Sequence, residues 1–554
     1  MMTKATQPVN NATNDRAIDR TIDSTNQHAN AMAMSAIESL SSESTSLIQY
    51  SSRGRVAVIG GIEAQEFASR LSGNLSAQVL LTDGAVEPGV RTIPVGNRRL
   101  QIEGYLGNFT IFLGDEGKAN FETVSVDLIL DLSAETFLTM PVKPPGYLTA
   151  IMEEPYLTLV EEELKGLTGT FEKPKYFDYD ASICAHGRSG IKGCTNCIDA
   201  CPAEAISSLA ESILVNPNLC QGGGVCASVC PTGAIRYVYP KATDTLATIR
   251  TLLKSYHEAG GVKPVIAFIA ASETELLNNK PANLLTVVVE ELASVGLEIC
   301  LSALAYGAKR VLLIDAGSMP DTVAEFLHQQ LNTANAILAG LGYKSLDYQH
   351  EAILIVDPQF LQQHCDVGNA FNLSKVASYV GSVKKRRTAL LAIDHLYQQS
   401  SNAQQTITLP EHSPFGRIIV DAKSCTLCMS CTSVCPSKAI DAGNDTPKLE
   451  FHELNCVQCG ICVTACPEHA ITLEPRLLAD NEQRRGVVTL HEEPPFCCIT
   501  CGKAFATKSL IDNMMQKLAG HYMFNSERAK QRLMMCEDCR VVDVVQDDEA
   551  MRSA

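Results

Sequence analysis

The residues with the clearest chemistry are cysteines in two consecutive runs near the C-terminal end of the chain. Each run has the form C-x2-C-x2-C-x3-C and is followed directly by proline. The cysteines are Cys425, Cys428, Cys431 and Cys435 in the first run, and Cys456, Cys459, Cys462 and Cys466 in the second. The short loop lets three thiolates converge on one cubane iron–sulfur cluster, and the fourth cysteine serves the cluster of the other run. The alternative is a pair of zinc sites, which also use C-x2-C pairs.

Crossed ligation predicts two ligand sets in this part of the chain. They are Cys425, Cys428, Cys431 and Cys466 for one cluster, and Cys456, Cys459, Cys462 and Cys435 for the other. The double run resembles the bacterial dicluster ferredoxin family. That resemblance implies a ferredoxin-like fold over residues 415–476 with two 4Fe–4S clusters that carry electrons.

An earlier group of cysteines follows the same plan with two departures. The insertion Ala185–Gly193 widens the first gap of its first run, and Gly223 stands where the second cysteine of its partner run is expected. The ferredoxin resemblance then implies a complete ligand set and an incomplete one. They are Cys184, Cys194, Cys197 and Cys230, and the three residues Cys201, Cys220 and Cys226.

Three thiolates leave one iron of a cubane without a protein ligand. The sequence leaves three interpretations open: a 3Fe–4S cluster, a 4Fe–4S cluster with water or a distant side chain at the fourth iron, or no cluster. We therefore expect three or four clusters in all.

His186 in the insertion is a cluster ligand or an exposed side chain. Cys365 could supply the missing ligand from an expected loop, and Cys300 is expected to be a buried, small apolar residue on a helix.

A different set of cysteines lies near the C-terminus. Cys498 and Cys501 form one C-x2-C pair, and Cys536 and Cys539 form another. Two such pairs fit a tetrahedral structural zinc site. The alternatives are a further iron–sulfur cluster and reduced thiols, and Cys497 is an alternative ligand. The segment resembles zinc ribbons in these knuckles.

The string C-P-x-x-A-I occurs four times, which indicates duplicated half-domains arranged as two pairs. The copies begin at Cys201, Cys230, Cys435 and Cys466. Short apolar runs before the first cysteine group and between the first and second groups predict strands of two α/β domains. The expected strands cover 55–59, 78–82, 126–132, 264–269, 310–314 and 352–356, with a hairpin at 99–114.

These elements predict a multidomain fold of α/β and α+β type, in which two ferredoxin-like dicluster modules are interleaved with two α/β domains. In chain order we expect a disordered tail (1–50), a small α/β domain (51–140), a connector (141–178), a variant dicluster module (179–240), an α/β domain (245–400), a dicluster module (415–476) and a zinc-ribbon-like cysteine-knuckle segment (485–554).

The sequence Val56–Gly61 is similar to the start of a nucleotide-binding βα unit, but the full G-x-G-x-x-G pattern is absent. Glu63 lies two residues after Gly61 and would oppose a phosphate at the helix start. We interpret the two glycines as a tight turn and keep a flavin or nicotinamide site as the alternative.

Bulk properties exclude several classes of protein. The chain has 554 residues and a formal net charge of −17. That charge argues against a nucleic-acid binder and suits docking to basic patches on redox partners. Residues 1–50 contain no apolar signal region, and we expect no membrane span. A reducing cytoplasm is the expected location.

The leading hypothesis is an electron carrier or electron-transfer subunit without a substrate of its own. The layout of the whole chain resembles the ferredoxin-type proteins encoded beside bacterial formate dehydrogenases, which implies a formate dehydrogenase as redox partner or as assembly client. Residues 264–343 also resemble the small iron–sulfur subunit of some hydrogenases and heterodisulfide reductases, without its cysteines. Two alternatives remain. One is an oxidoreductase subunit with a flavin, a nucleotide or an open iron, and the other is a maturation or docking factor.

Overall fold

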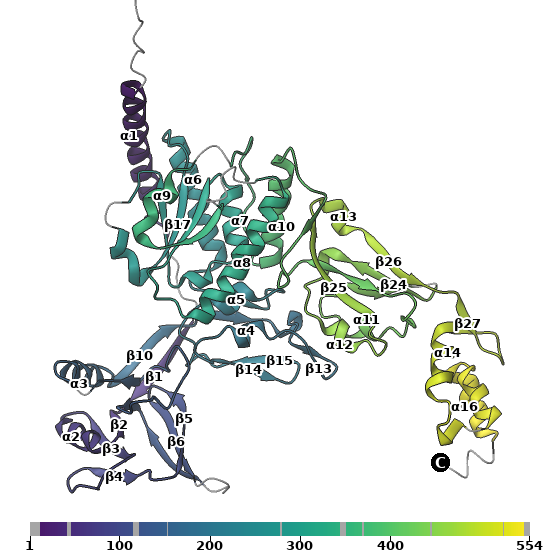
Figure 1. Cartoon of the computed structure of the whole chain (residues 1–554), viewed down its shortest axis with the longest axis horizontal. Coiled ribbons are helices and arrows are strands. Elements are labelled where there is room, and N and C mark those ends of the chain that lie inside the picture. Colours follow the sequence, from purple (N-terminus) through teal and green to yellow (C-terminus); the bar gives the residue numbers. More distant parts are fainter. Residues whose placement is uncertain are drawn as a thin grey trace, which may run out of the picture.

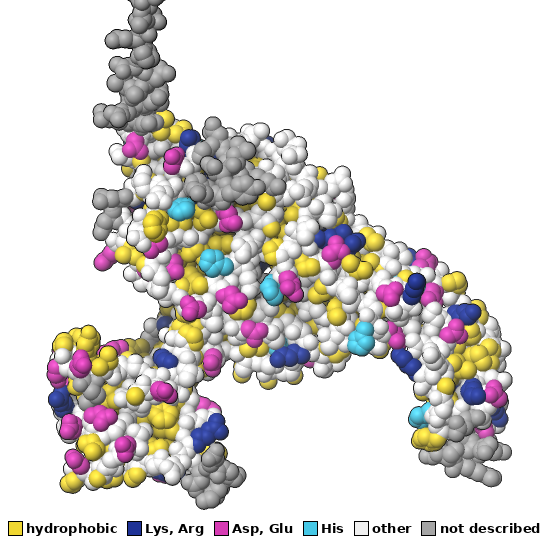
Figure 2. Space-filling model, viewed as in Figure 1, with side chains coloured by type: hydrophobic (Ala, Val, Ile, Leu, Met, Phe, Trp, Pro, Cys, Tyr) yellow, Lys and Arg dark blue, Asp and Glu magenta, His cyan; other side chains and the backbone are white. Residues whose placement is uncertain are grey.

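The computed structural model describes residues 12–40, 46–114, 121–151, 153–277, 280–343, 351–367, 371–443, 446–524 and 526–547. It is a mixed α/β structure (Figure 1). A central body of helices and parallel strands lies between an N-terminal lobe and a C-terminal segment, and these two parts project from the body in Figure 2. On the face shown there, acidic and basic side chains are interspersed. Within the described ranges, none of the helices combines the length and apolar character that a membrane crossing requires.

The N-terminal lobe is built on a five-stranded parallel sheet in the order β4-β3-β2-β8-β9. Because successive side chains of a strand point to opposite faces, Val56 and Val58 pack beside helix α2, while Ala57 and Ile59 face an antiparallel sheet. The parallel strands are β2 (Arg55–Gly60), β3 (Ser76–Leu81), β4 (Arg91–Pro94), β8 (Leu128–Asp131) and β9 (Tyr147–Thr149). The other elements are α2 (Ile62–Arg70), β5 (Arg99–Tyr105), β6 (Asn108–Gly114) and β7 (Phe121–Val126). The predicted strands and the hairpin of this lobe are confirmed.

The prediction of a connector at 141–178 is wrong. Strand β9 is an edge of the lobe's sheet, and helix α3 (Tyr156–Gly166) buries Leu157 and Leu164 in the same core as Val56 and Val58. Strand β10 (Gly169–Pro174) then pairs with β1 (Leu47–Ser52). The segment therefore completes the lobe and leads into the first cysteine module.

The central body contains a four-stranded parallel sheet in the order β18-β17-β19-β20. Its strands are β17 (Val265–Ala270), β18 (Leu284–Val289), β19 (Arg310–Ile314) and β20 (Ile353–Val356). The three predicted strands are present, and the apolar run at β18 was missed. The helices are α6 (Ala242–Glu258), α7 (Leu297–Ala305), α8 (Asp321–Gly340), α9 (Leu361–Cys365) and α10 (Lys385–Gln399).

The prediction of a disordered tail is wrong where the structure describes residues 1–50. Helix α1 (Ala12–Ile37) packs beside α6 through Ala29 and Ala33, both fully buried. Asn30 Nδ2 donates to the carbonyl oxygen of Leu284 at 2.7 Å, so the helix is also tied to strand β18. Residues 1–11 and 41–45 lie outside the described residues.

Two compact cysteine modules contact the central body. The first contains β11 (Phe177–Tyr179), β12 (Gly187–Arg188), β13 (Ile191–Lys192), α4 (Asn196–Asp199), β14 (Ile206–Leu209), β15 (Ser212–Val215), α5 (Val225–Val229) and β16 (Ile235–Tyr237). The second contains β21 (Thr406–Thr408), β22 (Gly416–Val420), α11 (Ser430–Val434), β23 (Ile440–Ala442), β24 (Lys448–His452), α12 (Ile461–Ala465), β25 (Ile471–Leu478), α13 (Asn481–Arg485) and β26 (Val487–Glu492). The C-terminal segment contains β27 (Pro495–Cys497), β28 (Ala504–Thr507), α14 (Lys508–Lys517), α15 (Glu527–Leu533) and α16 (Glu537–Val545).

Candidate metal centres

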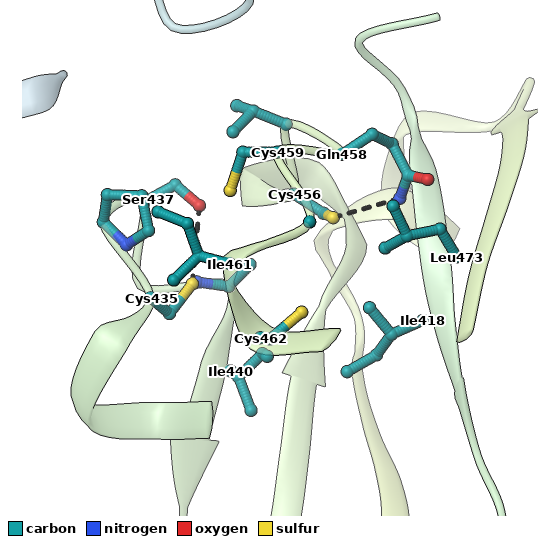
Figure 3. Close-up of a pocket in the computed structure, with 14 residues that line it drawn as sticks. Ile418, Cys435, Ser437, Ile440, Cys456, Gln458, Cys459, Ile461, Cys462 and Leu473 are labelled. Carbon is teal, nitrogen blue, oxygen red and sulfur yellow. Dashed lines mark hydrogen bonds between the residues drawn. The ribbon is translucent and has the colours of Figure 1, made fainter. Parts of the chain in front are cut away.

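The eight cysteines of the second module line two separate cavities. We name them site C and site D. Site C is lined by Cys435, Cys456, Cys459 and Cys462, and site D by Cys425, Cys428, Cys431 and Cys466. Each cavity thus takes three cysteines from one run and the last cysteine of the other. In Figure 3 the four sulfur atoms of site C point toward one shared space. Of these eight cysteines, only Cys428 is exposed.

The repeated C-P-x-x-A-I string has a defined local conformation. In all four copies the residue before the alanine has a positive φ, which turns the chain back toward the cysteine. These residues are Glu204, Gly233, Lys438 and His469. As a result, the backbone N–H of Ala439 donates to Cys435 Sγ at 3.2 Å, and that of Ala470 donates to Cys466 Sγ at 3.3 Å. Such bonds stabilise a thiolate and tune the potential of a bound cluster.

The first module contains one four-cysteine cavity, which we name site B. Its cysteines are Cys184, Cys194, Cys197 and Cys230. The insertion that widens this run forms a small hairpin of β12 and β13. Here too the fourth cysteine comes from the partner run, as in sites C and D.

His186 is buried at the edge of site B, and both of its ring nitrogens have hydrogen-bond partners. Its side chain is 1% exposed. Nδ1 lies 3.0 Å from the carbonyl oxygen of Cys194, and Nε2 lies 2.7 Å from Ser208 Oγ. Both ring nitrogens are therefore engaged, and the histidine fixes the insertion against the loop of Cys194. The interpretation of His186 as an exposed side chain is therefore wrong, and its two hydrogen bonds disfavour the alternative role as a cluster ligand, although the residue lines site B.

Cys201, Cys220 and Cys226 also lie near one another, and we name them site A. Cys226 interacts electrostatically with both of the others, and burial raises the pKa of all three thiols. Cys365 does not approach them, because it lies with Leu361 and Val367 in a core beside the central sheet. Cys300 is fully buried on α7, as predicted.

The loop of site A has the backbone shape of the complete loops, although Gly223 replaces a cysteine. In each loop the residues on both sides of the middle position have positive φ. The pairs are Leu427 and Met429, Gln458 and Gly460, and Gly222 and Gly224. A Cβ added at Gly223 would have no neighbouring heavy atom within 4 Å among the described residues. The conformation that presents three thiolates has therefore been kept without the middle side chain.

The surroundings of the cavities disfavour ionised cysteine side chains that have no metal partner. Burial raises the pKa of Cys459 to about 11 and that of Cys431 to about 12. A metal must displace these protons, because only the thiolate is a ligand. At site C, Gln458 Nε2 donates to Cys456 Sγ at 3.2 Å (Figure 3), a contact that the sequence did not suggest.

The C-terminal knuckles form a compact group. The sulfur atoms of Cys498, Cys501, Cys536 and Cys539 lie within 4.8 Å of one another. A tetrahedral zinc site with Zn–S bonds of about 2.3 Å requires sulfur separations of about 3.8 Å, and those of Cys501 and Cys536 are 3.7 Å apart. Burial opposes ionisation of Cys498, but N–H donors of Cys536, Cys501 and Thr500 lower its pKa to about 6. Cys497 is exposed and lies outside the group.

The turn at Gly60 and Gly61 holds a side chain where a phosphate would bind. The N–H of Gly61 donates to Glu63 Oε1 at 3.2 Å at the start of α2. A carboxylate therefore occupies the positive end of this helix. This arrangement matches the tight turn and disfavours the nucleotide alternative.

Comparison with known proteins agrees with the two modules. Residues 424–471 match the family described as a 4Fe-4S dicluster domain, and residues 213–236 match the 4Fe-4S binding domain. No curated protein matches the chain. The first match spans both runs of sites C and D, and the second contains Cys220, Gly223 and Cys226. The chain thus carries ferredoxin-type iron–sulfur domains, which suggest electron transfer.

Proposed function

We propose that the chain relays electrons between redox proteins through three 4Fe–4S clusters and one 3Fe–4S cluster. The observation that carries the proposal is the crossed lining of sites B, C and D. Each cavity gathers four thiols, and the fourth comes from the partner run, as bacterial ferredoxin ligation requires. Zinc sites do not need this exchange between runs, so it favours iron–sulfur clusters in both modules.

Site A supports the 3Fe–4S assignment. Its loop keeps the left-handed residues Gly222 and Gly224, and no described atom lies near the Cβ direction of Gly223 to replace the missing thiolate. Three thiolates match the three irons of such a cluster. The retained loop conformation disfavours the alternative in which these cysteines bind no cluster. Fixing a glycine-rich loop in one conformation costs conformational entropy, and cluster binding would offset that cost.

The described residues supply what a relay needs besides the thiolates. The N–H groups of Ala439 and Ala470 and the amide of Gln458 donate to ligand sulfurs, and such donors favour the more negative, reduced state of a bound cluster. The apolar walls of the cavities, including Ile440 and Ile471, exclude water. When bound, the clusters supply one-electron chemistry.

We propose a structural zinc ion at Cys498, Cys501, Cys536 and Cys539. This ion would stabilise the C-terminal segment, which docks beside site D through a hydrogen bond from Thr507 Oγ1 to the carbonyl oxygen of Thr426 at 3.1 Å. We further propose a formate dehydrogenase as partner. Its support is the resemblance of the chain's layout to ferredoxin-type proteins encoded beside such enzymes.

The relay is tested by its reduction and reoxidation. Anaerobic protein should lose visible absorbance with dithionite and regain it with an oxidised electron acceptor, over repeated cycles. A chain whose absorbance does not cycle is no relay. The partner is tested separately, by mixing the protein with formate and a formate dehydrogenase. Cycling with dithionite but not with formate would refute the partner alone.

A further inference from the structure

Helix α10 begins in a basic run that its own dipole does not favour. The run is Lys384, Lys385, Arg386 and Arg387, and α10 starts at Lys385. Cations near a helix N-terminus are unfavourable, because that end carries a partial positive charge. Lys384 and Arg387 are exposed, as expected for such a run, but Lys385 and Arg386 are not. The two middle residues therefore need compensation from other parts of the chain.

Lys385 binds the first module. Its Nζ donates to the carbonyl oxygens of Ala227 at 2.8 Å, of Ser228, and of Cys230 at 3.3 Å. These carbonyls lie at the C-terminal end of α5, where carbonyl oxygens lack helical partners and attract cations. Cys230 is also the cysteine that crosses into site B. Lys385 thus fixes the segment that delivers a ligand to this site.

Arg386 binds the second module in the same manner. Its guanidinium donates to the carbonyl oxygens of Leu454 at 3.0 Å, Cys456 at 2.8 Å and Pro414 at 2.6 Å, and stacks 4.6 Å from the ring centroid of Phe415. Cys456 lines site C. Burial lowers the pKa of Arg386 to about 10, so the group remains a cation at neutral pH. Lys385 and Arg386 are consecutive in the sequence, and each donates hydrogen bonds to backbone carbonyls of a different cysteine module.

The two modules touch beside this pair. Gly193, next to Cys194 of site B, packs so closely on Ile461 of site C that an added Cβ would lie 2.3 Å from Ile461 Cγ1. Cys194 and Cys459 interact electrostatically across the junction. Within the modules, Cys226 of site A interacts with Cys197 and Cys230, and Cys462 of site C interacts with Cys431 of site D.

We propose that Lys385 and Arg386 are positioning residues that hold site B against site C, so that both modules form one path in the order A, B, C, D. The inference rests on the proposed relay. It identifies the junction at Gly193 and Ile461 as the step that joins the modules. It also places sites A and D at opposite ends of the path. Site A contacts the N-terminal lobe, where Lys173 Nζ of β10 donates to the carbonyl oxygen of Cys220 at 2.6 Å, and site D contacts the C-terminal segment through Thr507.

The test compares substitutions within one basic run. The double variant Lys385→Met with Arg386→Met removes both grips, and Lys384→Met with Arg387→Met removes the same charge from exposed positions. In fully reduced protein, we expect the EPR splitting between sites B and C to be lost in the first variant and kept in the second. Iron content should be unchanged in both. Cys456→Ser, which disables site C, identifies the splitting that belongs to this pair.

Unchanged splitting in the double variant with full iron would overturn the proposal. If that variant loses iron, the conservative Arg386→Lys variant decides, because it keeps the charge but reaches fewer carbonyls and should weaken the splitting. Amide exchange provides a readout that needs no cluster. Protection at residues 227–230 and 454–456 should fall in the double variant and stay unchanged in the exposed-site control. A wild-type protein without reducible clusters would refute the relay, whereas intact exchange protection in the double variant would refute the grip.

Discussion

Replacing Gly223 by cysteine is the sharpest single change that the structure offers. A Cβ at this position would meet no heavy atom of the described residues within 4 Å, and the backbone there is not left-handed. The expected cost in the free energy of unfolding is therefore within about 0.5 kcal/mol, as for an unstrained surface change. The new thiol would stand where Cys428 and Cys459 stand in the complete loops. We expect it to become the fourth ligand of site A.

The assay counts iron and records EPR spectra of the oxidised protein. The parent should contain about 15 irons per chain and the variant about 16, because a cubane with four thiolates holds four irons. The oxidised 3Fe–4S core is paramagnetic, whereas an oxidised 4Fe–4S core of the ferredoxin type is not. The EPR signal of the oxidised parent should therefore disappear in Gly223→Cys.

The neighbouring glycines supply matched controls. An added Cβ at Gly224 would lie 2.6 Å from Ser294 Cβ, and one at Gly222 would lie 2.9 Å from the Tyr176 ring; both glycines are left-handed. Cysteine at either position should destabilise the protein by roughly 1–2 kcal/mol from backbone conformation alone. If Gly223→Cys has the iron content and spectrum of its parent, site A does not follow the ferredoxin layout. Equal tolerance of cysteine at all three positions would contradict the loop conformation.

Four further predictions follow from named contacts. Cys435→Ser should remove the cluster of site C, not that of site D, as judged from iron content and the EPR signals of the reduced protein; loss of site D alone would contradict crossed ligation. Cys501→Ser should release one zinc and make the C-terminal segment sensitive to protease with iron unchanged, whereas loss of iron would show a different role. Gln458→Met should lower the potential of site C by roughly 20–60 mV in a redox titration, because a donor to sulfur is lost, and an unchanged potential would refute this effect. Glu298 is buried on helix α7, and this burial raises the pKa of its carboxyl group above the value in the unfolded chain. Its contribution to the free energy of unfolding is therefore complete below the unfolded-state pKa and is lost as pH rises through the folded-state pKa. The urea midpoint of Glu298→Gln should therefore rise relative to that of the wild type between pH 4 and pH 8. A difference between the two midpoints that stays constant with pH would contradict the raised pKa.

The cysteine sets that line sites B, C and D could be predicted from the sequence because the pattern that defines them is local. The spacing of each run fixes which three thiols share a loop, and the proline after the fourth cysteine marks the exchange between runs. The same spacing also showed that Gly223 stands where a cysteine is expected. The spacing did not show that Gly222 and Gly224 keep the left-handed conformation of the other loops, since glycine is compatible with many conformations.

The predictions that failed, a disordered tail and a connector, depend on contacts between segments that are distant in the sequence. Helix α1 has a polar sequence without a broad apolar face, and it is held by small buried residues such as Ala29 and by the side-chain amide of Asn30. The supposed connector contains an edge strand whose partner, β8, lies earlier in the chain. Lys385 and Arg386 cannot be distinguished in the sequence from Lys384 and Arg387. Only tertiary packing separates the buried cations from the exposed ones.

Metal analysis of anaerobically purified protein, with EPR before and after dithionite, tests the central claim most directly. The relay predicts about 15 irons with matching sulfide, one zinc, a paramagnetic signal in the oxidised protein, and interacting 4Fe–4S signals after reduction. About eight irons, with no signal from the first module, would contradict it. That result would leave one working pair of sites and shift the account toward a docking or maturation role.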